Sequence, residues 1–321
     1  MGKRSTLLSS LQYHLVTGAL FLIRTLPYNA VLTIGRALGF AGYYLDGFHR
    51  KVAQIQMKAA LGDAYRSSLV REVFMFHGDI LIDAIRFSFM GDEEIRKRIV
   101  VEGTEHLEAA LATGRGLMII TGHIGNWEVL SHLPRVIGIR FCVMADVRND
   151  PRLEAIIDGI RARSGATILP PTGKALMLVK ELKKGNIIGI LVDQRGKRSD
   201  GLLCDFFGMP APTNPAPAFL AVKGDALVLS VHAIKEGDTY RVVFSEALDS
   251  RDFGTLREAM QPLSDTMQAW VEDVVRKYPH QWFWLHSRWT RRSDMREIIR
   301  TGRDFREYIR AQANETGGEK V

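Results

Sequence analysis

Residues 117–130 read LMIITGHIGNWEVL, and this stretch sets the expectation for the fold. It begins with four apolar residues, a run typical of a short strand that is buried on both faces. Thr121 and Gly122 then turn the chain, and Asn126 is a suitable N-cap for a helix that begins at Trp127. A buried strand, a turn and a helix in this order predict one βα unit of a parallel sheet.

The same pattern recurs further along the chain. Short apolar runs occupy residues 141–145, 166–169 and 187–192, and enough residues for a helix separate each run from the next. Residues 226–234 and 240–245 predict a hairpin that finishes the sheet. The sequence therefore predicts an α/β fold with a mainly parallel sheet flanked by helices.

Periodicity and composition assign the other segments. Residues 51–112 are predicted to be helical, and residues 66–90 among them carry apolar side chains at three- and four-residue spacing. Residues 256–278 predict a long helix. Residues 193–217 are rich in Gly, Pro, Arg and Lys and predict a long surface loop, a kind of segment that is often functional.

Aromatic residues mark the last predicted strand, residues 281–286. Trp282 and Trp284 lie within it, and Trp289 follows. These side chains fit either an aromatic strand packed in the core or a belt at a membrane interface.

The N-terminus predicts a membrane anchor. Residues 5–23 contain no charged residue and have the length of a membrane span, although Gln12 and His14 make them a poor spanning helix. An in-plane anchor fits equally well, and an ordinary buried helix pair is the alternative. We predict a hydrophobic helical membrane anchor over residues 1–50, an α/β domain over residues 51–302 and a polar tail over residues 303–321.

Basic residues indicate the orientation of the chain and the type of partner. Lys3 and Arg4 precede the apolar segment, and a larger group of basic residues (Arg24, Arg36, Arg50 and Lys51) follows it, which favours a cytoplasmic location for the bulk of the chain. The net charge is +7, from 43 Lys and Arg against 36 Asp and Glu. This balance suits an anionic partner such as a phosphate, an acidic carrier protein or anionic lipids, or simply a solvated basic surface. The two cysteines are isolated, so we expect neither a disulfide framework nor a metal site.

His123 is the candidate for chemistry. It follows the strand at residues 117–120, where open α/β sheets place their ligands, and Glu128 lies in the first turn of the next helix. We expect the loop to fold His123 back toward Glu128, whose carboxylate would fix the tautomer of the imidazole. The other ring nitrogen could then take the proton of an alcohol that attacks a thioester. The sequence contains no G-x-S-x-G motif, so direct transfer is preferred to an acyl-enzyme.

A family resemblance strengthens this interpretation. The block TGHIGNWE at residues 121–128 resembles the His-x4-acid signature of the bacterial lipid A late acyltransferases, within the lysophospholipid acyltransferase-like group. The resemblance continues in order through VRNDP, IRARSG, LVDQRG, FFGMPAPT and QWFWLHSRW, and it covers residues 103–292. The last block differs from many members, because it lacks a second basic residue after His286 and a proline after the final Arg.

The resemblance implies a His123/Glu128 dyad, an acyl carrier protein or coenzyme A thioester as donor, and a lipid acceptor. A lipid A precursor is the expected acceptor, at a bacterial inner membrane with the catalytic domain facing the cytoplasm. No cofactor or metal is implied.

Further residues are candidates for substrate binding. Arg148 and Arg195 lie inside the resembling blocks and could hold a phosphate, and Arg163 could do the same, because guanidinium groups bind phosphate bidentately. Asp193 could place the acceptor, hold Arg195 or serve a structural role. Two residues complete this set of candidates: Asn126, which is also the expected helix cap, and Arg288.

Other functions are also consistent with the sequence. The acceptor could be a phosphatidylinositol mannoside, a lysophospholipid or an ornithine lipid. A thioesterase would use the same base with water, and a basic membrane-binding protein would need no catalysis. No RNP, zinc-finger or helix-turn-helix signature supports a nucleic-acid partner.

Overall fold

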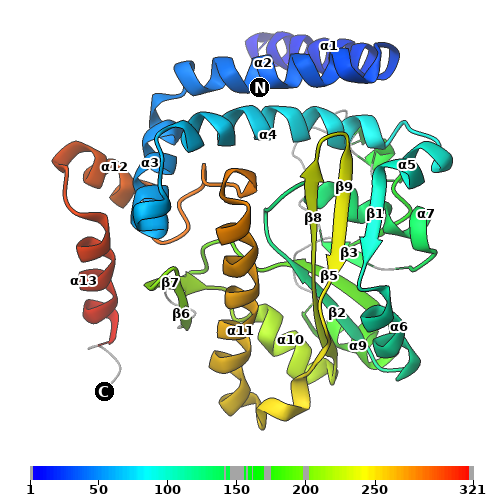
Figure 1. Cartoon of the computed structure of the whole chain (residues 1–321), viewed down its shortest axis with the longest axis vertical. Helices are drawn as coiled ribbons and strands as arrows, with labels where there is room; N and C mark the ends of the chain where they lie inside the picture. The colour runs from blue at the N-terminus through cyan, green and yellow to red at the C-terminus, as the bar shows by residue number, and fades with distance from the viewer. Residues whose placement is uncertain are drawn as a thin grey trace.

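A mainly parallel sheet organises the protein (Figure 1). The computed structural model describes residues 3–140, 142–144, 155–156, 158–160, 162–169, 175–197 and 202–317. In this part of the chain, the strands of the central sheet are β1 (Ile99–Glu102), β2 (Leu117–Thr121), β3 (Cys142–Met144), β4 (Thr167–Leu169), β5 (Ile187–Leu191), β8 (Leu227–Glu236), β9 (Thr239–Phe244) and β10 (Leu248–Asp249).

The strand order confirms the predicted fold class and places the hairpin inside the sheet. The order is β1-β9-β8-β2-β5-β3-β4, and all neighbours are parallel except β8 and β9, while β10 pairs antiparallel with β8. The predicted hairpin is β8–β9. It does not finish the sheet, because β1, which lies in the region predicted to be helical, pairs with β9 and forms the edge.

Both faces of the sheet are buried. Met118 and Ile120 of β2 pack into one hydrophobic cluster, and Leu117 and Ile119 pack into another, as alternation along a strand requires. The first face is covered by α9 (Ala175–Lys183), α10 (Ala216–Gly224) and α11 (Leu256–Lys277), and the second by α5 (Asp92–Arg98), α6 (Thr104–Ala112), the 3-10 helix η2 (Trp127–His132) and α7 (Leu133–Ile137). This burial explains why the first four residues of β2 are all apolar.

A helical layer crosses one end of the sheet. It contains α1 (Lys3–Thr25), α2 (Tyr28–Leu45) and α4 (Ser68–Phe87), which lie together at the top of Figure 1, and α3 (Gly47–Leu61) descends from it. Glycines allow α2 and α4 to touch through their backbones, since a Cβ on Gly39 would lie 2.3 Å from the carbonyl oxygen of Phe74. Among the helices that the structure describes, none is long and apolar enough to cross a membrane.

Two predicted segments have a different structure. Residues 193–217 contain the hairpin β6 (Leu202–Phe206) and β7 (Met209–Thr213), because Phe206 and Met209 are buried and the turn between them adopts positive φ at Phe207 and Gly208. Residues 281–286 do not form a strand. Gln281 ends the 3-10 helix η5 (Pro279–Gln281), and residues 282–286 continue as irregular chain, with an isolated bridge between Trp282 and Ile124.

The tryptophans of this segment are held in the core by their own contacts. Trp282 and Trp284 are both fully buried. The indole N–H of Trp282 donates to Asp193, and that of Trp284 donates to the carbonyl oxygen of Pro279. Trp289 is equally buried, so the tryptophans belong to the core and not to an interface belt.

The C-terminal segment is more than a polar tail. Helix α12 (Arg292–Thr301) is followed by α13 (Phe305–Gly317), and both belong to the folded body. Phe305 and Ile309 of α13 are buried in the same cluster as the tryptophans. Apolar side chains four residues apart on one helix face account for this packing.

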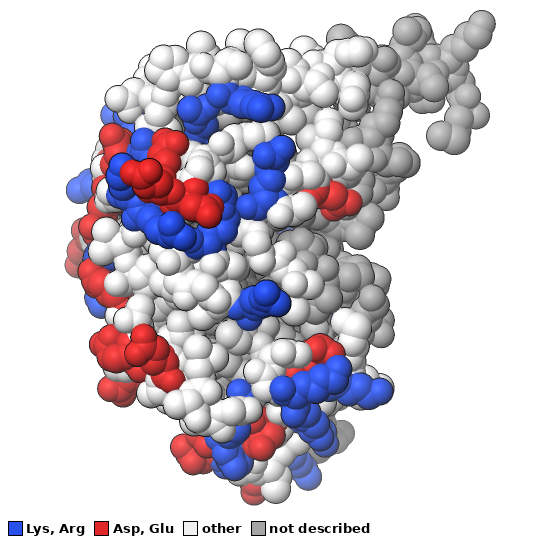
Figure 2. All heavy atoms as spheres, turned by 90° about the vertical axis from the view of Figure 1, so that its right-hand side faces the viewer, with Lys and Arg blue, Asp and Glu red and all other residues white. Residues whose placement is uncertain are grey.

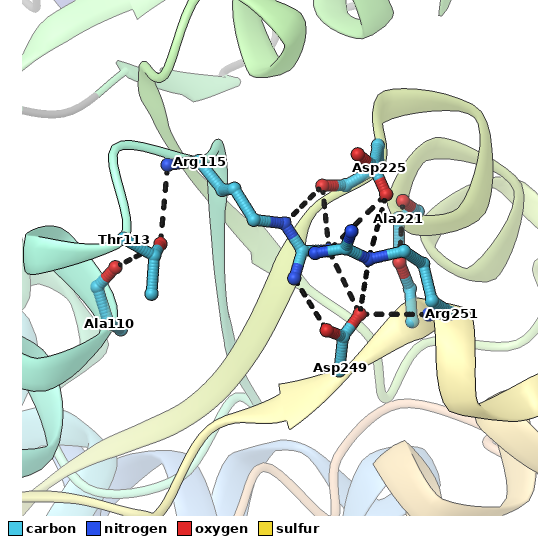
Figure 3. Close-up of polar contacts among 8 residues, drawn as sticks. Ala110, Thr113, Arg115, Ala221, Asp225, Asp249 and Arg251 are labelled. Atoms are coloured by element: carbon cyan, nitrogen blue, oxygen red, sulfur yellow. Dashed lines mark hydrogen bonds and ion pairs between the residues drawn. The ribbon is translucent and has the colours of Figure 1, made fainter.

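Ion pairs hold the end of the sheet where β2 begins. Arg115 donates to both carboxylate oxygens of Asp249 at 2.5 and 2.8 Å and to the carbonyl oxygen of Asp225 (Figure 3). The hydrogen bond from Arg115 is the main reason that the pKa of Asp249 is well below its usual range. These contacts tie the starts of β2 and β8 to the end of β10, at the end of the sheet opposite to His123.

The glycine contact between α2 and α4 yields a stability prediction. Gly39→Ala should lower the free energy of unfolding by about 1–3 kcal/mol, because the new methyl group overlaps the backbone of α4. Gly42→Ala is the matched control on the same helix, since its Cβ would lie 3.5 Å from a Phe74 ring atom, an ordinary contact. Urea unfolding followed by circular dichroism measures both. Equal free energies of unfolding for the two variants would show that the backbones of α2 and α4 are not in contact at Gly39.

Candidate functional site

Sheet register brings His123 and Asp193 together. Strands β2 and β5 pair in parallel with Thr121 opposite Leu191, so His123 and Asp193 each follow a paired residue by two positions. Both residues therefore leave the carboxyl ends of adjacent strands at the same edge of the sheet, as the sequence predicted for His123.

The Asp193 carboxylate is the centre of this arrangement. Its Oδ1 accepts a hydrogen bond from His123 Nδ1 at 2.7 Å, and its Oδ2 accepts from the His123 backbone N–H at 2.7 Å and from Trp282 Nε1 at 2.7 Å. Asp193 is fully buried. A Cβ on Gly122 would lie 3.1 Å from Oδ2, so a glycine in the loop gives the carboxylate room.

The loop that carries His123 is fixed on both sides. Gly125 has a φ of 60°, and a Cβ there would lie 1.8 Å from the carbonyl oxygen of Ala233, so this position requires glycine. The Gly125 N–H donates to the carbonyl oxygen of Gln281, and the Phe283 N–H donates to the carbonyl oxygen of His123. The imidazole is thus held between the end of β8 and residues 281–283.

The charges of this pair shift both pKa values. Burial alone would raise the pKa of Asp193, but the charge and the hydrogen bond of His123 outweigh it and hold that pKa well below the usual range. Burial alone would lower the pKa of His123, but Asp193 first and Glu128 second raise it above 6.5. Since Nδ1 donates to Asp193, the neutral imidazole carries its lone pair on Nε2.

Gln194 contacts that free nitrogen. Its side-chain amide nitrogen lies 3.1 Å from His123 Nε2, and an N–H group donating to the lone pair is the arrangement that the neutral tautomer permits. Gln194 is exposed, so its side chain separates Nε2 from solvent without being locked in the core.

The prediction that Glu128 orients His123 needs correction. Glu128 is exposed on the first turn of η2, and among the described contacts no hydrogen bond joins it to the imidazole. Asp193 occupies Nδ1 instead, because the pairing of β2 with β5 brings it to the imidazole from the other side. Glu128 acts on His123 through its charge, which raises the pKa of the imidazole.

A pocket of about 550 Å³ adjoins the imidazole. It is lined by Phe48, His49, Gln194, Arg195, Phe283, Leu285, His286, Ser287, Thr290 and Arg292. Three of these residues contact His123 directly or through their rings: Gln194 by its hydrogen bond, and Phe283 and His286 with ring centroids 6.4 Å from that of His123. The pocket therefore opens beside the reactive nitrogen.

Arg195 is the predicted binding residue that lines this pocket. Its Nη1 donates to the carbonyl oxygen of Gly196 at 3.2 Å. Arg163 lies elsewhere: it is exposed, and its guanidinium stacks over Phe89 at 5.2 Å, near the end of α4. Arg148 lies outside the described residues.

Arg288 and Asn126 are structural in this arrangement. Arg288 is fully buried and donates to the carbonyl oxygen of Pro212, to Thr213 Oγ1 and to Gln268 Oε1, and its burial lowers its pKa to about 10. The Asn126 side chain donates to the Tyr240 hydroxyl at 3.1 Å and does not cap η2, although Asn126 occupies the N-cap position as predicted. Neither side chain reaches the pocket.

Two residues of the site were missed from the sequence. Gln194 directly follows Asp193 in the LVDQRG block, and a polar residue one position beyond a strand end was a usable signal. Trp282 was expected either in the core or in a membrane-interface belt, and no local pattern indicates that its indole N–H binds a carboxylate. Among the described residues, no group of three His, Cys, Asp or Glu side chains is arranged to hold a metal ion.

Comparison with known proteins places this geometry in a family. The family model for bacterial lipid A biosynthesis acyltransferases matches residues 1–291. The lipid A biosynthesis lauroyltransferase of Escherichia coli is 26% identical over 291 residues, which cover 86% of this chain and 90% of that protein. The phosphatidylinositol mannoside acyltransferase of Mycobacterium tuberculosis is 28% identical over 194 residues, which are 59% of this chain and 60% of that protein.

The chain thus spans about three fifths of the mycobacterial relative but most of the enterobacterial one. A solved 1-acyl-sn-glycerophosphate acyltransferase of Thermotoga maritima is 16% identical, with a TM-score of 0.40 over 79% of this chain and 98% of that one. Because the family model covers nine tenths of the sequence, including the His123 loop and the Asp193 strand end, the chain belongs to the bacterial lipid A biosynthesis acyltransferase family.

Proposed function

We propose that the protein transfers an acyl chain from a thioester to a hydroxyl group of a lipid, with His123 as general base and Asp193 as the residue that positions it. The observation that supports this most directly is the hydrogen bond between His123 Nδ1 and a fully buried Asp193. That bond leaves Nε2 unprotonated and facing Gln194 at the edge of a pocket. Family membership supplies the reaction class.

The chemistry then proceeds in two proton transfers. His123 Nε2 takes the proton of the acceptor hydroxyl as its oxygen attacks the thioester carbonyl carbon, and a tetrahedral intermediate forms. The Asp193 carboxylate stabilises the imidazolium that results, and the nearby charge of Glu128 adds to this effect. The intermediate collapses with cleavage of the carbon–sulfur bond, and the imidazolium returns the proton to the departing thiolate.

Gln194 has a place in this scheme. Its amide nitrogen, 3.1 Å from His123 Nε2, occupies the position that the attacking hydroxyl must take. Binding of the acceptor therefore displaces the amide. The displaced N–H group remains beside the reacting carbonyl and can donate to the oxygen as it gains charge.

The relatives supply two candidates for the acceptor. A lipid A precursor is the first candidate acceptor, because the lauroyltransferase of Escherichia coli aligns over most of both chains. A phosphatidylinositol mannoside is the alternative, on the strength of the mycobacterial relative. The donor is an acyl thioester of acyl carrier protein or coenzyme A.

The helical layer is suited to contact with a membrane surface. Its outward side chains include Phe21 and Leu22 on α1, Leu38 and Leu45 on α2 and Leu81 on α4, all of them exposed. In Figure 2 the upper part of the molecule carries few charged residues, whereas acidic and basic groups intermingle below it. An apolar face of this kind lies in the plane of an interface. We propose that α1 and α2 rest on the inner membrane with the catalytic domain in the cytoplasm.

Turnover measurements test the proposed base. The purified protein is supplied with acyl carrier protein or coenzyme A thioesters and a panel of lipid A precursor, lysophospholipid and mannosylated phosphatidylinositol. His123→Ala should lower kcat by about 10²–10⁴-fold, the range for loss of a general base. Asp193→Asn should lower kcat more than Glu128→Gln does, because of these two carboxylates only that of Asp193 accepts a described hydrogen bond from the imidazole.

Other outcomes of the same assay would contradict the proposed base or the proposed reaction. Transfer that survives in His123→Ala would rule out the proposed base, provided that circular dichroism shows the variant to be folded. Release of free fatty acid without transfer to any acceptor would indicate a thioesterase. A protein that binds lipid but processes no thioester would be a membrane-binding protein without catalysis.

Vesicle co-sedimentation tests the membrane-facing layer. Phe21→Glu and Leu38→Glu should each reduce binding to phosphatidylglycerol-containing vesicles by about ten-fold or more, because burial of one such side chain contributes about 1.5–3 kcal/mol. Leu176→Glu is the matched control, since Leu176 is 74% exposed but lies on α9 at the other end of the molecule. An equal loss of vesicle binding in all three variants would show that the exposed apolar side chains of α1 and α2 do not mediate contact with the membrane.

A further inference from the structure

A cluster of charged side chains lies between the helical layer and the sheet. At its centre is Asp83 of α4, which is fully buried. Lys235 Nζ lies 2.7 Å from Asp83 Oδ2 and 3.3 Å from Asp79 Oδ2, and Arg36 of α2 lies 3.3 Å from the same oxygen of Asp79. Figure 1 shows α4 crossing the end of the β8–β9 hairpin that carries this lysine. Two carboxylates and two cationic groups thus balance in charge.

Stability alone is a weak reason for such a cluster. Replacing a buried ion pair with well-packed apolar side chains is often neutral or stabilising, because the removal of two charges from water costs about as much as their attraction contributes. A fully bonded polar network gives the core a fixed geometry, since each hydrogen bond restricts the direction of its donor and its acceptor. The partners of Asp83 therefore indicate what this carboxylate holds in place.

Two tyrosine hydroxyls donate to Asp83. Tyr28 at the start of α2 donates to Oδ1 at 2.9 Å, and Tyr240 of β9 donates to Oδ2. Burial first and the charge of Asp83 second raise the pKa of both tyrosines, so both hydroxyls keep the proton that they donate. The oxygen of Tyr240 can then only accept, and Asn126 Nδ2 donates to it at 3.1 Å. Each hydrogen bond from Asn126 to the carboxylate thus has one possible direction.

This chain of hydrogen bonds ends at the loop that carries His123. Asn126 follows His123 by three residues and is buried. Its backbone N–H donates to the carbonyl oxygen of Ala233 at 2.9 Å, and its side chain donates to the Tyr240 hydroxyl. One residue therefore attaches the loop to β8 through its backbone and to β9 through its side chain. The attachment is separate from the contacts of Asp193, which hold the imidazole itself.

A second branch leads from the cluster to the other segment beside the imidazole. The backbone N–H of Lys235 donates to Gln281 Oε1 at 3.0 Å, and Gln281 Nε2 donates to the carbonyl oxygen of Lys235 at 3.0 Å. The next residue, Trp282, donates to the carboxylate of Asp193. Both segments that orient the catalytic imidazole are thus connected to Asp83 through hydrogen bonds.

We infer that Tyr240 and Asn126 are positioning residues for His123, and that they transmit the place of the Asp83 carboxylate to the catalytic loop. Neither side chain is among the residues that line the pocket. The bond between the amide and the hydroxyl keeps the loop at one distance from β9, so that His123 Nε2 stays at the edge of the pocket. The inference rests on the proposed function for the role of His123, but the attachment of the loop requires no turnover.

A double-mutant cycle tests the positioning role. Tyr240→Phe and Asn126→Ala each remove the hydrogen bond between the hydroxyl and the amide. Each variant should lower kcat about ten-fold and leave KM within a factor of about two, because the imidazole is displaced while the pocket is intact. The double variant should be about as slow as either single variant, since both changes delete the same bond. Independent effects would multiply to about 100-fold.

Tyr28→Phe is the matched control. It removes the other tyrosine hydroxyl from the same carboxylate and leaves the bond between Asn126 and Tyr240 in place. Its kcat should stay within a factor of about two of the wild-type value, although it loses a comparable hydrogen bond. A kcat as low as that of Tyr240→Phe would show that the loss reflects a weakened core, and it would overturn the inference.

Hydrogen exchange read by mass spectrometry tests the attachment without turnover. The N–H groups of Gly125 and Asn126 donate to backbone carbonyl oxygens, so their exchange reports local opening of the loop. Tyr240→Phe should raise the exchange rate of residues 122–127 about ten-fold and leave that of β2 unchanged. Tyr28→Phe should leave both rates unchanged. Wild-type exchange of residues 122–127 in Tyr240→Phe would show that the hydroxyl does not hold the loop.

The two measurements separate this inference from the proposed function. If no acceptor is acylated but the loop exchanges faster in Tyr240→Phe, the proposed function fails and the attachment of the loop stands. If acyl transfer occurs and Tyr240→Phe has the kcat of the wild type, the positioning role fails and the function stands. Single losses that multiply in the double variant would contradict an action of Tyr240 and Asn126 through one hydrogen bond.

Discussion

The Asp193 carboxylate is buried with three hydrogen-bond donors around it, and the geometry of the site depends on them. Two of the donors belong to His123 and one to Trp282, so a single side chain joins the end of β5, the loop after β2 and the segment before α12. A buried charge without partners costs several kcal/mol, and these donors offset that cost. The carboxylate therefore fixes the tautomer and the position of the imidazole together.

A second buried network links the site to the helical layer. Lys235 at the end of β8 contacts Asp83 of α4 at 2.7 Å, and the Tyr240 hydroxyl donates to the same carboxylate. Asn126, on the loop beyond His123, donates in turn to the Tyr240 hydroxyl. The layer proposed to rest on the membrane and the loop that carries the base are thus connected through polar groups in the core, which keeps the imidazole at a fixed depth below the helices.

The sequence predicted much of this fold from local patterns. The apolar run before His123, the hairpin β8–β9 and the helix at residues 256–278 were all recognisable because periodicity and turn residues are local properties. The hairpin β6–β7 was hidden in a segment rich in Gly and Pro, because the residues that contact it, such as Trp289 and Arg288, are distant in the sequence. The short strand β1 lacked a pattern of its own and is defined by pairing with β9.

The site was predictable only in part, because contacts between residues that are distant in the sequence complete it. His123 follows a strand end that the local sequence reveals, whereas its partner comes from the register of β2 with β5, seventy residues apart. Glu128 was favoured because it is close to His123 in the sequence, but the carboxylate that binds the imidazole is that of Asp193, which follows the neighbouring strand β5. Arg288 was a candidate for substrate binding, but the three hydrogen bonds that its side chain donates place it in the core.

The pH dependence of kcat/KM tests the pairing of His123 with Asp193 most directly. A general base acts only when it is neutral, so the rate should fall as the pH drops through the pKa of His123, which lies above 6.5. Asp193→Asn removes the charge that raises this pKa, and its acid limb should move to lower pH while the maximal rate falls. An acid limb that keeps its position in Asp193→Asn, or that moves only in Glu128→Gln, would contradict the account.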